Sequence, residues 1–137
     1  MRLTVLASAL ALLPLVASAE APLVRIGQTV EGQLTAEDAP TSDQGVSRDY
    51  RVEAKAGQFL IVSVKSSDFD AKVTVFNPDR SQAIENDDRA DGNFDPLAVA
   101  ETKVDGVYRI RVASLGSGEE GKVFGRFTMK VVAFSEE

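Results

Sequence analysis

Asp105-Gly106-Val107-Tyr108-Arg109-Ile110-Arg111-Val112 is the stretch that decides the fold class. A turn-forming Asp-Gly pair opens the stretch, and apolar side chains then alternate with arginines at a period of two. Such alternation is typical of a half-buried antiparallel strand, which has one apolar face and one polar face. The stretch therefore predicts a β-strand that follows a tight turn and directs its arginines toward solvent.

The same period of two recurs in three other runs, at residues 60–65, 72–76 and 126–131. Turn-forming sequences such as Asn77-Pro78-Asp79 and the glycine-rich segment 116–121 separate these runs. Short alternating runs at this spacing predict an all-β protein, and they favour an antiparallel β-sandwich or barrel. Beyond the N-terminal segment, the sequence contains no convincing amphipathic helix.

The first residues resemble a secretory signal peptide. A positive start, Met1-Arg2, precedes an apolar run from Leu3 to Val16, and Ala17-Ser18-Ala19 fits the small-residue cleavage site. The apolar run is shorter than the roughly 20 residues of a membrane-spanning helix, so we expect no stable membrane insertion. We therefore expect residues 1–19 to be a signal peptide and residues 20–137 to be one exported domain, in the periplasm or outside the cell.

The composition restricts the possible chemistry. The sequence contains no histidine, cysteine or tryptophan, and without an imidazole the Ser-His-Asp and Cys-His types of nucleophilic catalysis are excluded. The net charge of −6 becomes −7 once Arg2 is removed with the signal peptide. An acidic surface disfavours nucleic acid and anionic membranes as partners. We expect a protein that is not an enzyme, does not bind nucleic acid and is monomeric.

An ordered set of short motifs resembles the bacterial pre-peptidase C-terminal domain family. The motifs are Val30-Glu31-Gly32-Gln33-Leu34, Asp49-Tyr50, Ala56-Gly57-Gln58, Asp68-Phe69-Asp70, Asn77-Pro78-Asp79, Asn86-Asp87-Asp88 and Gly106-Val107-Tyr108. The resemblance runs from about Gly27 to Val132 and implies a jelly-roll-like β-sandwich. Members of the family serve as accessory modules of secreted proteases and other hydrolases, and related collagen-binding modules bind calcium. We expect this module to stand alone, without an attached catalytic domain.

The segment 86–95 is rich in side-chain oxygens and is the candidate metal site. Its potential calcium ligands are Asp87, Asp88, Asp91, Asn93 and Asp95. An EF-hand is excluded, because Arg89 and Ala98 occupy positions that need oxygen ligands, and no helices flank the loop. A looser calcium site with help from Asp70 and a solvated structural turn are both consistent with the sequence.

Basic residues form the second candidate site, for a partner. These residues are Arg109, Arg111, Arg126 and Lys130. If their two strands are neighbours, the four charges share one sheet face and could bind an anionic glycan or an acidic protein. The alternative is a solvated face whose cations pair across strands with Asp and Glu.

From these observations we expect a non-catalytic, exported binding or accessory module that engages a protein or a polysaccharide. The second hypothesis is a calcium-stabilised structural or chaperone-like protein that assists a separately encoded secreted hydrolase.

Overall fold

The computed structural model describes residues 20–88, 95–116 and 121–135, and these residues form an all-β fold without an α-helix. The predicted signal peptide, residues 1–19, lies outside the described residues. The strands are β1 (Leu23–Val24), β2 (Thr29–Leu34), β3 (Ala39–Pro40), β4 (Val46–Ala54), β5 (Gln58–Lys65), β6 (Ala71–Phe76), β7 (Gln82–Asn86), β8 (Leu97–Thr102), β9 (Gly106–Ser114) and β10 (Gly125–Ser135). The predicted all-β class is confirmed.

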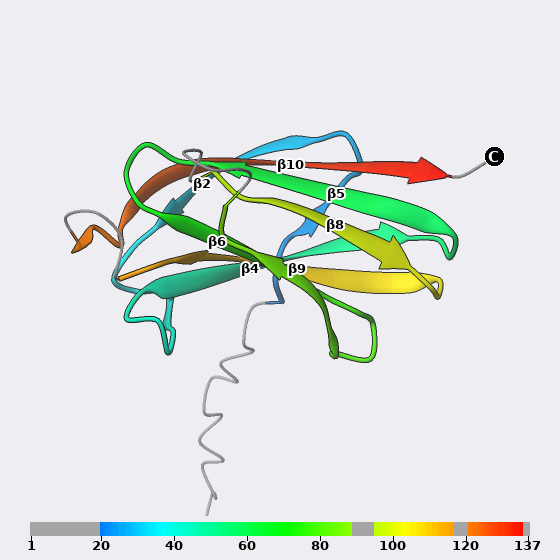
Figure 1. Cartoon of the computed structure of the whole chain (residues 1–137), viewed down its shortest axis with the longest axis horizontal. Coiled ribbons are helices and arrows are strands. Elements are labelled where there is room, and N and C mark those ends of the chain that lie inside the picture. Colours follow the sequence, from blue (N-terminus) through cyan, green and yellow to red (C-terminus); the bar gives the residue numbers. More distant parts are fainter. Residues whose placement is uncertain (1–19, 89–94, 117–120, 136–137) are drawn as a thin grey trace, which may run out of the picture.

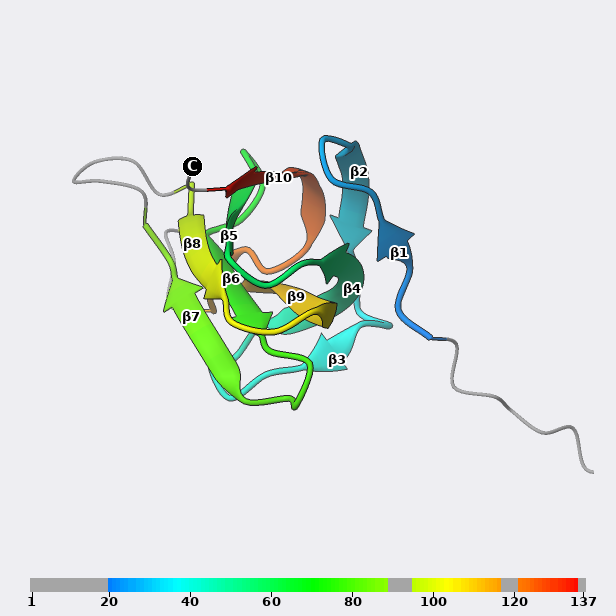
Figure 2. The same ribbon diagram turned by 90° about the vertical axis from the view of Figure 1, so that its right-hand side faces the viewer.

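The strands form two sheets that pack face to face as a sandwich (Figures 1 and 2). Sheet A has the order β1-β4-β9-β6-β7, with the short β3 paired to β4. Sheet B has the order β2-β10-β5-β8. Every pairing is antiparallel except that of β1 with β4. The predicted antiparallel β-sandwich is therefore also confirmed.

The core lies between the sheets and contains the apolar side chains of the alternating runs. The fully buried large side chains include Leu60, Val62, Val64, Tyr108, Ile110, Val112, Met129 and Val131. Burial of each large apolar side chain stabilises the fold by about 1.5–3 kcal/mol. The Tyr108 hydroxyl donates a hydrogen bond to the carbonyl oxygen of Val104 at 2.7 Å, so its one polar group is satisfied inside the core.

Consecutive strands often lie in different sheets. β9 belongs to sheet A and β10 to sheet B, so the chain crosses the sandwich between residues 114 and 125. The outward side chains of these two strands therefore point away from each other, toward opposite surfaces. None of the described segments is a helix long and apolar enough to span a membrane.

Candidate binding surfaces

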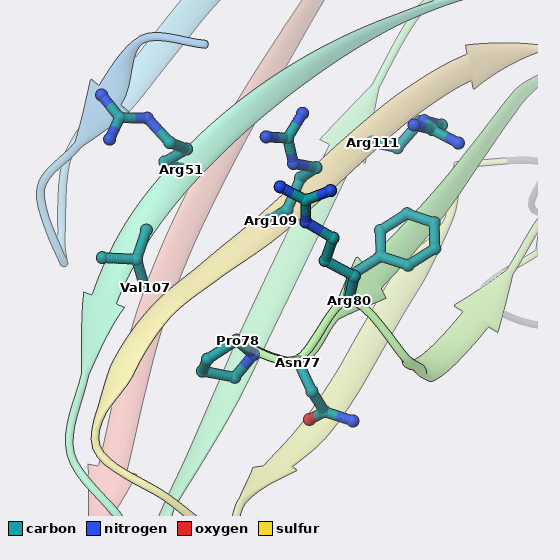
Figure 3. Close-up of a pocket in the computed structure, with 8 residues that line it drawn as sticks. Arg51, Asn77, Pro78, Arg80, Val107, Arg109 and Arg111 are labelled. Carbon is teal, nitrogen blue, oxygen red and sulfur yellow. The ribbon is translucent and has the colours of Figure 1, made fainter. Parts of the chain in front are cut away.

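Arginine side chains gather on the outer face of sheet A. Arg51 comes from β4, Arg109 and Arg111 come from β9, and Arg80 lies in the turn between β6 and β7. They line a depression of about 350 Å³ together with Phe76, Asn77, Pro78 and Val107. Figure 3 shows the four arginines around this depression. None of these lining residues is acidic. We call this site, defined by the four arginines, the arginine depression.

Asp49 of β4 holds two of the arginines in place from beside the depression. Arg111 donates hydrogen bonds to both carboxylate oxygens, at 2.8 and 3.1 Å, and Arg109 donates one at 3.0 Å. Partial burial would raise the pKa of Asp49, but the hydrogen bonds from Arg111 and Arg109 outweigh it and hold the pKa below its ordinary value. The cross-strand pairing with acidic residues that the sequence offered as an alternative is thus confirmed for these two arginines.

The other two arginines are held more loosely. The Arg51 guanidinium donates a hydrogen bond to the carbonyl oxygen of Ala21 at 2.7 Å and lies 3.5 Å from the exposed carboxylate of Glu20. Arg80 has a positive φ of 72°, and its side chain makes no hydrogen bond or ion pair with any residue that the structure describes. Neither residue was among the site residues predicted from the sequence. Arg51 sits at an outward position of the run around Tyr50, so alternation could have identified it; nothing local marks Arg80.

Arg126 and Lys130 do not join this site, so the shared basic face is a prediction that the structure does not bear out. Both side chains are exposed on β10, which pairs with β2 and β5 in sheet B. The condition for a shared face was that β9 and β10 be neighbours, and they lie in different sheets. The four cations are therefore divided between the two outer faces of the sandwich.

Apolar side chains gather on the outer face of sheet B. Val132 of β10, Ile61 of β5 and Val99 of β8 form one row across three strands. Phe134 and Phe59 are paired in the next row. Phe134 is 57% exposed and Val99 46% exposed, whereas the other three are half-buried. We call these five residues the apolar face.

A break in the alternating pattern accompanies this surface. The outward positions of β10 change from Arg126, Thr128 and Lys130 to Val132 and Phe134. A solvated strand needs polar residues at outward positions, so apolar residues there indicate a surface with another role. This signal is present in the sequence, but the apolar face was not among the sites predicted from it.

Only part of the predicted calcium site lies in the described residues. Asp91 and Asn93 fall outside them. Asp87 and Asp88 are exposed, and Asp95 accepts a hydrogen bond from the backbone N–H of Ser66 at 3.1 Å. No group of three or more acidic side chains within the described ranges is arranged to hold a metal ion.

Asp70 adds one observation to that site. Its Oδ1 atom is buried and has no hydrogen-bond partner. Burial raises the pKa of this carboxyl, and the nearby carboxylates of Asp88 and Asp87 raise it further. Asp70 therefore lies within electrostatic range of two of the predicted ligands, but among the described residues these three carboxylates are not arranged as a group that could hold a metal ion. Such oxygen donors suit calcium chemically.

Comparison with known proteins adds a sequence relationship. The pattern of the bacterial pre-peptidase C-terminal domain matches residues 46–114, just over half of the chain. The matched segment begins with β4 and ends with β9, so it contains all four arginines of the depression. A comparison with curated protein sequences finds no relative.

Solved structures share the fold. The pre-peptidase C-terminal domain of a collagenase from Bacillus anthracis is 16% identical, with a TM-score of 0.55, over 82% of this chain and 94% of that one. PliG from Aeromonas hydrophila, a periplasmic inhibitor of g-type lysozyme, is 19% identical, with a TM-score of 0.50, over 81% and 98%. PliG from Salmonella Typhimurium is 13% identical, with a TM-score of 0.52, over 83% and 99%.

Proposed function

The chain belongs to the bacterial pre-peptidase C-terminal domain family, and on this premise we propose that it is an exported, non-catalytic module that binds another protein through the apolar face. The observation that carries the proposal is the continuous row Val132–Ile61–Val99 with Phe134 and Phe59 beside it. Water-exposed apolar side chains on adjacent strands are costly unless a partner covers them.

The composition of this surface favours a protein as the partner. Aromatic and aliphatic side chains form its centre, and charged residues such as Lys130 and Glu101 lie at its edge. This arrangement of an apolar centre and a polar rim is typical of protein–protein interfaces. A polysaccharide would present many hydroxyl groups, and the apolar face offers few groups that could hydrogen-bond to them.

The fold neighbours support a binding role outside the cytoplasm. Two of them are described as periplasmic inhibitors of g-type lysozyme, and a third is the pre-peptidase C-terminal domain of a collagenase. The absence of histidine and cysteine from the sequence agrees with a module that lacks nucleophilic catalysis. We propose that residues 1–19 direct export, that processing leaves Glu20 as the first residue, and that the free protein is a monomer.

A calcium-stabilised accessory protein is the second candidate function. One observation favours it: the Oδ1 atom of Asp70 is buried and unsatisfied, and the charges of Asp88 and Asp87 raise the pKa of the same carboxyl. When bound, calcium would supply positive charge that offsets the repulsion between these carboxylates. The binding and structural roles are compatible, because Asp70, Asp87 and Asp88 do not belong to the apolar face.

Partner capture tests the binding proposal. The wild-type protein, the variant Phe134→Ser and the control variant Phe124→Ser are immobilised and exposed to the exported-protein fraction of the parent bacterium. Phe124 is 48% exposed and lies outside the apolar face, so it matches Phe134 in chemistry. Purified g-type lysozyme is the first defined probe, because of the fold neighbours.

The proposal expects wild type and Phe124→Ser to retain one protein that Phe134→Ser loses, and the purified partner to reproduce the difference. Equal retention by all three proteins would reject the apolar face as the binding surface. Light scattering on the same samples measures self-association. A dimer that Phe134→Ser dissociates would assign the apolar face to a second copy of this chain.

A further inference from the structure

We propose that the arginine depression binds an acidic peptide segment through its carboxylates. This site is separate from the apolar face, because the depression lies on the outer surface of sheet A and the apolar face lies on that of sheet B. The inference therefore adds a second ligand class to the proposed protein-binding function and does not depend on it.

The depression concentrates positive charge on an acidic protein. Among the described residues, its four arginines form ion pairs with two carboxylates, Asp49 and Glu20, so the cations of the depression outnumber their ion-pair partners by two to one. The whole chain carries a net charge of −6. The electric field of a cationic recess attracts anionic ligands, and the acidic surface around it repels them. Anionic ligands should therefore bind at the recess in preference to the rest of the protein surface.

The strand register places two of these cations directly opposite each other. Arg51 of β4 is the cross-strand partner of Arg109 of β9. Like charges at directly opposite positions of an antiparallel pair are destabilising. A carboxylate bound between the two guanidinium groups would attract both cations and offset the repulsion between them. Ligand binding would thus explain why two arginines occupy directly opposite positions.

The arginines keep most of their hydrogen-bond donors available. With the described residues, their side chains make four hydrogen bonds: one from Arg51, one from Arg109 and two from Arg111. The guanidinium of Arg80 makes none. Because a guanidinium presents parallel N–H groups that match a carboxylate, the free donors suit bidentate recognition of Asp or Glu side chains.

The walls of the depression favour a peptide over other anions. Phe76 lies beneath Arg111, with 5.0 Å between the guanidinium carbon and the ring centre, and Pro78 and the 40% exposed Val107 form an apolar wall. These surfaces can contact the methylene groups of a peptide. A sugar would require acceptors for its hydroxyl groups, and Asn77 is the one lining side chain that can supply one.

Fluorescence anisotropy with a labelled hexaglutamate peptide tests the proposal on the full chain, with a hexaglutamine peptide as the uncharged control. We expect saturable binding of hexaglutamate that weakens as salt is added, and no binding of hexaglutamine. Arg80→Ala should lower the affinity by about fivefold, Arg109→Gln by about tenfold, and Arg80→Lys by less than Arg80→Ala, given typical strengths of charge-assisted hydrogen bonds.

Lys130→Ala is the matched control, because it removes one exposed positive charge from the opposite face. A change of less than about twofold supports a defined site, since exposed charges far apart are screened. Equal losses in Lys130→Ala and Arg80→Ala, or no binding of hexaglutamate at low salt, would overturn the proposal. Polygalacturonate and inorganic phosphate serve as competitors, and tighter binding of either one than of hexaglutamate would overturn the assignment to a peptide.

Discussion

The outer faces of the two sheets are built on the same alternating strand pattern, yet they differ in what they present to solvent. On sheet A the outward positions of β4 and β9 carry charges, and Asp49 pairs with Arg109 and Arg111. On sheet B the outward positions at one end of β5 and β10 are apolar. Alternation determines which side chains enter the core, whereas the chemistry of the outward positions distinguishes one face from the other.

This difference has consequences for stability. On the outer face of sheet A, Asp49 pairs with two arginines, so the loss of this one carboxylate leaves both cations unbalanced. The outer face of sheet B contributes little to the core, so substitutions there should change the affinity for a binding partner more than the free energy of unfolding. Four measurements test this contrast, and the first has the largest expected effect.

Asp49→Ala should destabilise the protein by about 1–3 kcal/mol, because charge-assisted hydrogen bonds are lost and the repulsion between Arg51 and Arg109 is less well offset. Urea unfolding at pH 7 measures the change. Glu53→Ala is the control, since Glu53 is an exposed outward residue of the same strand. Equal effects of the two substitutions would show that Asp49 has no special role on sheet A.

Acid should selectively weaken sheet A through the same carboxylate. The folded-state pKa of Asp49 lies below its ordinary value of 3.8, so its contribution is present above about pH 4 and is lost as the pH falls through the folded-state pKa. We expect the stability difference between wild type and Asp49→Asn to shrink as the pH falls below about 4. A difference that is constant from pH 7 to pH 2 would contradict the pairing.

Asp70 extends the contrast to a carboxylate that has no cationic partner among residues 20–88, 95–116 and 121–135. Its raised pKa means that ionisation opposes folding at pH 7, so Asp70→Asn should stabilise the calcium-free protein, by less than about 1 kcal/mol because solvent screens this carboxyl. Thermal melts in EDTA measure this effect. In millimolar calcium we expect wild type to melt at a higher temperature and Asp70→Asn to respond less. An unchanged wild-type midpoint would reject the calcium proposal.

Phe134→Ser should have the smallest effect on folding, below about 0.5 kcal/mol, because surface substitutions away from buried contacts rarely exceed this value. Urea unfolding alongside Asp49→Ala compares the two faces directly. A destabilisation of 2 kcal/mol or more would mean that Phe134 packs against the fold itself. The apolar face would then not be available to bind a partner.

Local patterns were sufficient to predict the strands and the sandwich. Tyr108, Ile110 and Val112 are buried as their alternation indicates, and the turn at Asn77-Pro78-Asp79 separates β6 from β7. The motif order also led to the correct family. Each of these predictions depends on residues close together in the chain.

The candidate sites were less predictable because they depend on distant contacts. Arg109 and Arg111 were recognised, but their partner Asp49 lies 60 and 62 residues away, and Arg51 and Arg80 were missed. Arg126 and Lys130 were grouped with them because β9 and β10 are consecutive, whereas the chain changes sheets between these strands.

The alternation of side chains along a strand follows from backbone geometry alone, because successive side chains point to opposite sides. The sequence therefore determined the strand positions, the buried residues and the all-β class without reference to any neighbour. The order of the strands in the sheets cannot be obtained from local alternation, because it depends on which distant segments of the chain pair with each other. Only the tertiary structure decided that Arg51 faces Arg109, that Arg80 closes the same depression, and that Val132, Ile61 and Val99 form one row.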